Sequence, residues 1–378
     1  MAYQMALVIN KDLVFGSDKT NFPILFNENC SNLSSDFWSN ISDTTSGLDI
    51  RFYDTVSKSV EYSREIVTLD HTGHTLESWI QIPILSSNID TTFVCEVGGG
   101  TKINDTSLWA DLGAMGIYHL QDGADSGGRD NSGDIFVDVT SVNGYISDAY
   151  SFDGTTSYIQ LTSNMDFTSN GILYAVSAWT NLENVKPLGS DWRDSMSTIF
   201  SRGYRCPTNA RGWSSFGLGY SNAAKLQFGI TATGTCSAGY CYSLYETDAT
   251  ISLGEWHYVA CTIYNYPLNT RIVNLYIDDS TRSFNILYNN YNKNYSHNIN
   301  ERTRIGSNYR IGYNYGNFYG VIDELRIFEN HTNNFDSDWF YTEYANQTDM
   351  SSFLDATAIT SSGITVFRRR MKLNTSGF

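Results

Sequence analysis

The chain has 378 residues and a mass of 42.5 kDa, a length that suits two β-sandwich units better than one small domain. Its net charge of −16 argues against a nucleic-acid partner, because phosphate binding needs clustered Lys and Arg side chains. Hydrophobic residues make up 41% and aromatic residues 14%, with only 5 prolines, so the composition favours aromatic-rich strands over disorder.

The N-terminal segment is expected to be a strand. Residues 1–10 have no basic stretch ahead of their apolar run, and the run ends at Asn10 and Lys11. This pattern is typical of a first strand and not of a secretory signal. No part of the chain approaches the stretch of about 18 apolar residues that a membrane span requires.

Residues 1–103 are expected to form a first β unit. Ile80, Ile82 and Ile84 alternate with other residues at a period of two, which predicts a strand with one buried face. The glycine run at 98–100 predicts the boundary of the unit. The other segments with strand character are 6–9, 22–26, 49–53 and 92–97.

The first part of the chain contains a series of short motifs in a characteristic order. They are Asn-Phe-Pro-Ile at 21–24, Asp-Ile-Arg-Phe-Tyr-Asp at 49–54, Glu-Tyr at 61–62, Glu-Ile at 65–66, Trp-Ile-Gln-Ile-Pro at 79–83 and Leu-Ser-Ser at 85–87. In this order they resemble the small β domain called DUF2341, which occurs beside laminin G-like modules in surface and phage proteins. The resemblance implies a small β-sandwich and names no chemistry.

Residues 114–345 are expected to form a second, larger β unit. Its motifs include Met-Gly-Ile-Tyr-His-Leu at 115–120, Ser-Phe-Asp-Gly at 151–154, Gly-Glu-Trp-His-Tyr-Val-Ala at 254–260 and Gly-Val-Ile-Asp-Glu-Leu-Arg-Ile-Phe at 320–328. In that order they resemble the concanavalin A-like, laminin G-type jelly-roll domains. The predicted fold class is therefore all-β, with a small sandwich followed by a jelly-roll sandwich. Asp336 or Ser337 is expected to cap a brief helix after the last strand.

The remaining residues, 346–378, are predicted to be a separate C-terminal tail or arm. Residues 359–367 are rich in Ser and Thr and prone to form a strand, and residues 367–372 carry the most concentrated basic patch. Two interpretations stay open here: a solvated terminus, or an arm that adds a strand or contacts an acidic partner.

The cysteines fall into two groups, each even in number. Even numbers permit disulfides within each unit without demonstrating them. No Cys-x-x-Cys spacing occurs, which argues against a zinc ribbon. The first group is Cys30 and Cys95, and the second is Cys206, Cys236, Cys241 and Cys261.

No catalytic carboxylate pair is recognisable, although the family that the second unit resembles includes glycoside hydrolases. Those enzymes carry two Glu and one Asp as Glu-x-Asp-x-x-Glu on one strand, and here Glu246 and Asp248 are not followed by a second Glu. Asp323 and Glu324 are adjacent, so on a regular strand they would point to opposite faces. The prediction is that the protein is not an enzyme.

Asp323 is the carboxylate of greatest interest. At period two it shares a face with Val321, Leu325 and Ile327, and an acidic group on a core face needs partners. Two interpretations stay open: a structural lock by backbone N–H groups or an Arg, or a Ca²⁺ ligand, which the resemblance favours. The predicted calcium ligands are Asp122, Asp130, Asp153 and Asp323.

Aromatic and Asn residues are concentrated in two stretches, 288–295 and 313–319. Tyr faces flanked by Asn side chains are typical of sugar-binding surfaces, whereas the alternative is a polar hairpin whose tyrosines pack on neighbouring strands or on a partner subunit. The candidate ligand-binding residues are Tyr291, Asn292, Tyr313, Asn314 and Tyr315.

Together these features predict a non-catalytic structural or adhesion protein of a virion surface or extracellular surface, such as a phage decoration, fibre or tail component. We expect it to be oligomeric, to contact other virion or surface proteins, and to bind host polysaccharide. A secreted carbohydrate-binding module is the alternative, and an unrecognised glycoside hydrolase or lyase is a third class.

Overall fold

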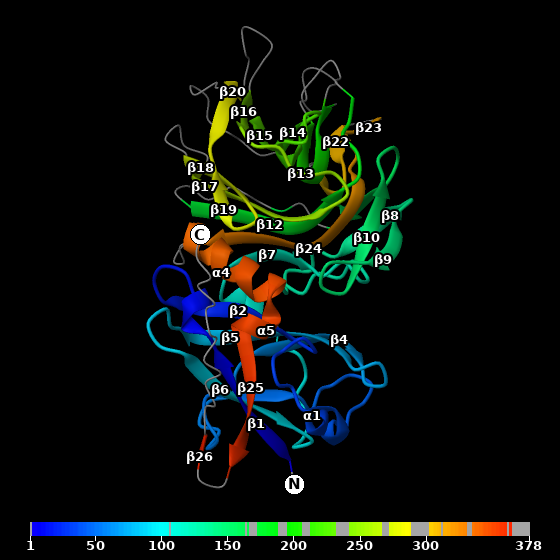
Figure 1. Cartoon of the computed structure of the whole chain (residues 1–378). Helices are drawn as coiled ribbons and strands as arrows, with labels where there is room; N and C mark the ends of the chain where they lie inside the picture. The colour runs from blue at the N-terminus through cyan, green and yellow to red at the C-terminus, as the bar shows by residue number, and fades with distance from the viewer. Residues whose placement is uncertain are drawn as a thin grey trace, which may run out of the picture. The chain divides into compact units, whose positions relative to one another are not determined.

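The computed structural model describes residues 2–105, 107–162, 165, 172–187, 195–205, 212–231, 242–266, 272–288, 302–310, 313–330, 335–360 and 363–364. The chain divides into two compact units, Met1–Asp105 with Thr348–Phe378, and Thr106–Gln347. The first unit therefore combines both ends of the chain, drawn in blue to cyan and in red in Figure 1. The sheets of both units are antiparallel, and the predicted all-β fold class is confirmed.

The first unit contains a five-stranded sheet in the order β26-β25-β1-β6-β3. β1 lies in the middle of this sheet, and its residues from Met5 to Ile9 are all buried. The bounds are β1 (Tyr3–Ile9), β3 (Arg51–Tyr53), β6 (Thr91–Val97), β25 (Leu354–Thr360) and β26 (Gly363–Ile364).

The C-terminal segment contributes a strand to the first unit. Residues 346–378 were expected to form a separate tail, but β25 pairs with β1 over five registered residues, from Met5 opposite Ala358 to Ile9 opposite Leu354. The short helix α5 (Met350–Phe353) precedes β25, and both belong to the first unit. The basic patch at 367–372 lies outside the described residues.

A three-stranded sheet, β2-β5-β4, completes the strands of the first unit. Ile80 and Ile82 are buried, as the alternation predicts, but Ile84 is 64% exposed. Ile84 lies opposite the exposed Thr20 near the end of the β2–β5 ladder, where the core no longer covers the sheet. The bounds are β2 (Lys19–Asn27), β4 (Arg64–Asp70), β5 (Thr75–Leu85), η1 (Lys11–Leu13) and α1 (Ser35–Asn40).

The second unit is a sandwich of two large antiparallel sheets. One sheet runs β19-β18-β17-β12-β24-β10-β9, with β7 also paired to β24, and we call it the β24 sheet. Its bounds are β7 (Ala114–Tyr118), β9 (Thr140–Asn143), β10 (Asp148–Asp153), β12 (Ile172–Leu182), β17 (Trp256–Tyr266), β18 (Ile272–Ile277), β19 (Ser280–Arg282) and β24 (Tyr319–Asn330).

The other sheet runs β20-β16-β15-β14-β13-β21-β11-β8. Its bounds are β8 (Gly133–Val137), β11 (Tyr158–Leu161), β13 (Ser197–Arg205), β14 (Gly212–Tyr220), β15 (Leu226–Thr231), β16 (Tyr242–Thr247), β20 (Phe284–Tyr288) and β21 (Arg302–Ile305). The core between the two sheets is formed by residues such as Val176, Phe200, Leu218, Val259 and Ile327. In Figure 1 the two sheets form two layers, with β13, β14 and β15 above β12 and β24.

Helices are few in the second unit. α2 (Ser107–Ala110) precedes β7, and α4 (Ser337–Thr348) follows β24. The Asp336 carboxylate accepts the Trp339 backbone N–H at 3.0 Å, so the predicted helix and its cap are confirmed. A short hairpin, β22 (Asn308–Arg310) with β23 (Tyr313–Tyr315), pairs apart from the two large sheets.

A β-bulge interrupts β24 and changes which side chains face the core. The pairing with β12 shifts between Ser177 and Trp179, and Glu324 adopts a φ of 49°. Ile322 and Leu325, three residues apart, therefore both point into the core, together with Ile327. The prediction that Asp323 shares a face with Leu325 and Ile327 was wrong, because the extra residue of the bulge reverses the alternation.

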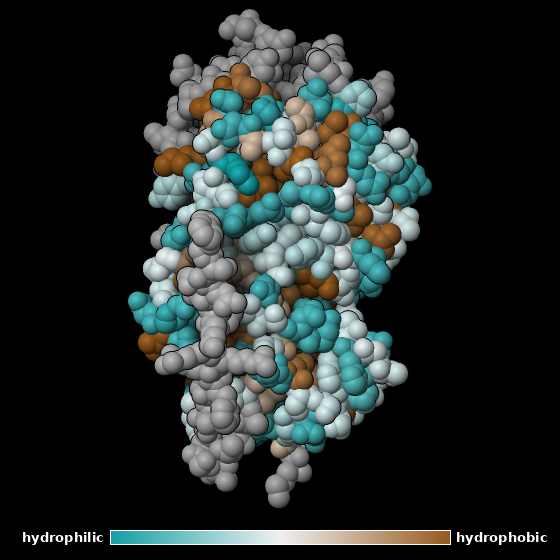
Figure 2. All heavy atoms as spheres, viewed as in Figure 1, coloured by the Kyte–Doolittle hydropathy of each residue, from teal (hydrophilic) through white to brown (hydrophobic). Residues whose placement is uncertain are grey.

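The cysteines of the described residues are thiols. Cys30, Cys95 and Cys261 are buried and free, so no bond joins Cys30 to Cys95. Cys206, Cys236 and Cys241 lie outside the described residues. No described helix is long and apolar enough to cross a membrane. On the face drawn in Figure 2, hydrophobic side chains appear in separate patches among hydrophilic ones.

Candidate functional site

The outer face of the β24 sheet carries a row of aromatic and polar side chains. Residues of β12 alternate, with Val176, Ala178 and Leu182 in the core, so Trp179 and Asn181 point outward. Trp179 lies opposite Tyr258 of β17 on one side and opposite Asp323 of β24 on the other, and Asn181 lies opposite Trp256. Three neighbouring strands therefore present this row on one face.

Two further elements place aromatic rings over the row. Tyr145, in the turn between β9 and β10, stacks on Trp179 with a centroid distance of 3.6 Å and an interplanar angle of 14°. Its ring centroid also lies 5.9 Å from that of Trp256. Tyr344 of α4 lies 5.8 Å from Trp179.

We call Tyr145, Trp179, Trp256 and Tyr344 the aromatic platform. Trp179 is buried, whereas Tyr145, Trp256 and Tyr344 are each half-buried, so three of the four residues are partly accessible to solvent. Rings that are held rigidly at a surface can bind the apolar face of a sugar or another flat ligand at little cost in conformational entropy.

Polar groups border the aromatic platform. The Asp278 carboxylate contacts Nδ1 of His257 at 2.9 Å and accepts the Tyr258 backbone N–H at 3.1 Å. The side-chain oxygen of Asn181 is buried and has no hydrogen-bond partner among the described residues. Burial, followed by the neighbouring Tyr344 and Asp278, raises the pKa of Tyr145 to about 12, so its phenol stays neutral near pH 7.

Asp323 lies beneath the turn that carries Tyr145. One carboxylate oxygen, Oδ2, accepts the backbone N–H groups of Tyr145 at 2.8 Å and of Ile146 at 3.0 Å. The side chain is 1% exposed, and Oδ1 has no partner within the described residues. Of the two interpretations left open by the sequence, the structure shows the lock by backbone N–H groups.

The pH dependence of stability should report on Asp323. Burial, and then the charge of Glu324, raises the pKa of Asp323 to about 8. An acid whose pKa is raised on folding contributes stability that is complete below its ordinary pKa and is lost as the pH rises towards 8. We expect Asp323→Asn to remove a downward slope of about 1.4 kcal/mol per pH unit between about pH 5 and pH 7.5.

The measurement is urea unfolding of both proteins across that range, followed through the second unit. The difference in unfolding free energy between wild type and Asp323→Asn should change with pH in favour of the variant. A difference that stays constant would contradict the raised pKa.

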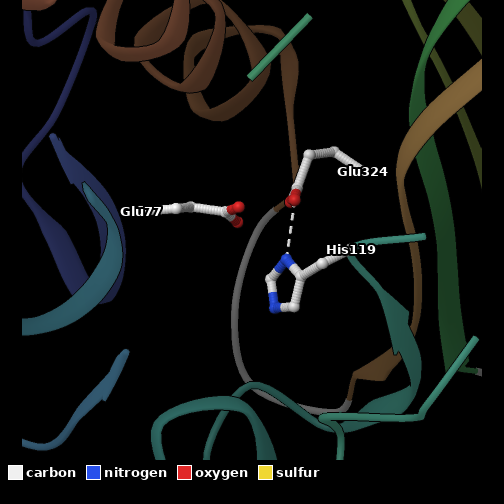
Figure 3. Close-up of side chains that lie close together, drawn as sticks. All are labelled: Glu77, His119 and Glu324. Atoms are coloured by element: carbon white, nitrogen blue, oxygen red, sulfur yellow. Dashed lines mark hydrogen bonds and ion pairs between the residues drawn. The ribbon is translucent and has the colours of Figure 1, made fainter. Parts of the chain in front are cut away.

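A buried ionic network lies further along the outer face. Nδ1 of His119 contacts Oε1 of Glu324 at 2.6 Å, and Figure 3 shows the imidazole turned towards that carboxylate. Arg326 contacts Glu324 at 2.7 Å and Glu343 of α4 at 2.5 Å. Burial acts to raise the pKa of Glu324, but the charges of His119 and Arg326 outweigh it, so the pKa lies below its ordinary value.

The four predicted calcium ligands do not form one cluster among the described residues, and two of them accept hydrogen bonds within their own loops. Asp153 accepts hydrogen bonds from Thr155, Thr156 and Ser157, and these outweigh burial and lower its pKa. Asp122 accepts the Ala124 N–H at 2.8 Å. Within the described ranges, none of Asp122, Asp130, Asp153 and Asp323 belongs to a group of three side chains close enough to share one ion. Calcium binding stays a prediction.

The predicted sugar-binding residues are only partly within the described structure. Tyr291 and Asn292 lie outside it. Tyr313, Asn314 and Tyr315 form β23, and only the backbone of this strand is described. The sequence missed the aromatic platform, since its residues come from four separate segments that no spacing connects.

Comparison with known proteins supports the fold of the second unit. Residues 153–334 match the family model of the Concanavalin A-like lectin/glucanases superfamily. This segment includes every strand from β11 to β24. No curated protein matches the chain in sequence, and the resemblance of the first unit to DUF2341 stays a prediction.

Solved structures give distant similarities. The binding domain of Paraclostridial Mosquitocidal Protein 1 is 13% identical with a TM-score of 0.43, and the match covers 62% of this chain and 53% of that one. A Trypanosoma rangeli sialidase is 12% identical with a TM-score of 0.42, covering 77% and 44%. A pentraxin from Limulus polyphemus is 14% identical with a TM-score of 0.31, covering 47% and 73%. The chain thus spans about half of the first two structures, and we base no function on these similarities.

Proposed function

We propose that the protein is a non-catalytic adhesion protein of a virion or cell surface, and that its second unit binds a neutral glycan on the aromatic platform. The observation that carries this proposal is the platform itself: three half-buried rings held on one face of a sandwich whose family includes lectins. Trp and Tyr faces bind the apolar side of a pyranose ring, while neighbouring polar atoms orient its hydroxyl groups.

The polar border of the platform suits hydroxyl groups. Asn181 lies directly opposite Trp256 on the next strand, and its side-chain oxygen has no hydrogen-bond partner in the described structure. Asp278 lies close enough to Tyr145 and Tyr344 to raise the pKa of both phenols, after the effect of burial. Together with the net charge of −16, the Asp278 carboxylate disfavours polyanionic glycans and favours neutral ones.

The carboxylates support binding over hydrolysis. A glycosidase needs two carboxyl groups that flank a substrate and exchange protons with it. Here Glu324 and Glu343 both neutralise Arg326 in a buried site, and Asp323 holds two backbone N–H groups. Glu246, the nearest approach to a catalytic motif in the sequence, is bound by Gln227 at 2.5 Å.

Affinity electrophoresis through soluble β-glucan, mannan, galactan and dextran tests the proposal. We expect at least one neutral polysaccharide to retard the protein, and Trp256→Ala to weaken that binding by about tenfold, the effect of losing roughly 1.4 kcal/mol of stacking. Tyr264→Ala is the matched control, because Tyr264 is an exposed ring, 47% accessible, at the other end of the same strand.

Three results would contradict the proposal. The first is that none of the four polysaccharides retards the wild type. Equal losses of affinity in Trp256→Ala and Tyr264→Ala would show that the aromatic platform is not the binding site. Release of reducing sugar from any of the four polysaccharides would show catalysis. The surface location is tested separately, by imaging the protein in its native assembly and measuring whether it copurifies with particles in a fixed ratio.

A further inference from the structure

We propose that Asp323 is the positioning residue of the glycan site: by holding the turn between β9 and β10, it places the Tyr145 ring on Trp179. This inference rests on the proposed function, since it concerns how the aromatic platform is formed. Asp323 is buried and would not touch the ligand, so its effect on ligand binding would act through the position of Tyr145.

The first argument is the direction of the hydrogen bonds. Two consecutive N–H groups, of Tyr145 and Ile146, converge on Oδ2 of Asp323. Both belong to a four-residue turn that is closed by the Gly144 N–H to the Ser147 carbonyl at 2.6 Å. A single oxygen on β24 therefore fixes the backbone of the residue whose ring forms the platform.

The second argument is how closely the turn approaches the carboxylate. A Cβ atom added at Gly144 would lie 2.5 Å from Oδ2 of Asp323 and 2.8 Å from Cβ of Ala149, so a larger residue fits only if the turn or the Asp323 side chain moves. The turn is packed against Asp323 as well as hydrogen-bonded to it.

The third argument is the position of Asp323 within the row. It lies opposite Trp179 across the β12–β24 ladder, so the group that holds the Tyr145 backbone neighbours the ring on which Tyr145 stacks. The bulge at Glu324 makes this arrangement, because it puts Asp323 on the outer face while Leu325 and Ile327 remain in the core. The bulge redirects a side chain next to a functional surface, as bulges commonly do.

The experiment compares Asp323→Ala, which removes the acceptor, with Asp323→Asn, which keeps an oxygen in the same place. A second perturbation, Gly144→Val, displaces the turn without changing Asp323. Ser177→Ala is the matched control, since Ser177 lies on the same strand and face as Trp179, two residues away. Tyr145→Ala defines the full loss of the ring.

The first measurement needs no ligand. Near-UV circular dichroism reports the fixed packing of aromatic side chains, and the difference spectrum between wild type and Tyr145→Ala gives the signal of the stacked ring. We expect Asp323→Ala and Gly144→Val to lose this signal while Asp323→Asn and Ser177→Ala retain it. Retention of the signal in Asp323→Ala would overturn the inference.

The second measurement is a double-mutant cycle in affinity electrophoresis with the same four polysaccharides. We expect Asp323→Ala to weaken binding by about three- to tenfold, the range for one aromatic contact, and to add nothing in the Tyr145→Ala background. An equal loss in both backgrounds would show that Asp323 acts through general stability and would overturn the inference. If no polysaccharide binds the wild type, the glycan proposal fails, and the circular dichroism still decides whether Asp323 positions Tyr145.

Discussion

Deletion of residues 350–378 is expected to unfold the first unit and to leave the second unit folded. The deletion removes α5 and β25, and β25 is the strand that pairs with one side of β1. β1 then becomes an edge strand, although its residues from Met5 to Ile9 are all buried in the complete unit. An exposed, apolar edge strand is a site of aggregation.

The size of the effect follows from the buried side chains that are lost. Met350, Phe353 and Leu354 are at most 4% exposed, and burial of each contributes about 1.5–3 kcal/mol. The backbone bonds from Asn10 to Phe353 and from Ser31 to Leu354, each 3.0 Å long, are lost as well. This sum is comparable with the entire stability of a small domain, about 5–15 kcal/mol.

Hydrogen exchange with peptide resolution measures the two units separately. Peptides of β1 and β6 should lose their protection in the truncated protein, while peptides of β12 and β17 keep theirs. Asp355→Ala is the control, because it removes only a surface contact with Asn32 and should leave β1 protected. Protection of β1 in the truncated protein would show that the N-terminal residues fold alone.

The sequence predicted the β content and most strands of both units, because apolar residues alternate at period two wherever one face is buried. It did not predict that β25 pairs with β1. That contact joins residues more than 340 positions apart, and nothing in residues 354–358 identifies their partner strand. The glycine run at 98–100 lies a few residues before Asp105, where the N-terminal segment of the first unit ends, and residues 348–378 belong to the same unit.

The candidate site, too, was predicted from the sequence only in part. Asp323 stood out because a carboxylate among apolar residues requires partners, and the structure supplies two backbone N–H groups. The bulge at Glu324 escaped prediction, because strict alternation assumes a regular strand and no Gly marks the position of positive φ. The ring of Tyr145 escaped it too, since its packing on Trp179 depends on which turn lies over which strand.

Arg326→Met is expected to destabilise the second unit by about 3–5 kcal/mol, the usual cost of breaking a buried ion pair from one side. The methionine fills most of the space, but Glu324 and Glu343 remain as buried carboxylates without their shared cation. The triple variant with Glu324→Gln and Glu343→Gln should recover much of this loss, because the uncompensated charges are then gone.

The ion pair of Arg129 and Glu329, in which only the Arg129 side chain is exposed, provides the comparison. Its atoms lie 3.6 Å apart and the Arg129 side chain is 47% exposed, so Arg129→Met should cost less than about 1 kcal/mol. Urea unfolding of the four proteins, followed through the second unit, measures the differences. If Arg326→Met cost no more than Arg129→Met, the network would be a solvated surface feature. If the triple variant were no more stable than the single one, packing of the guanidinium on Trp109, 5.0 Å from its ring, would be the larger contribution.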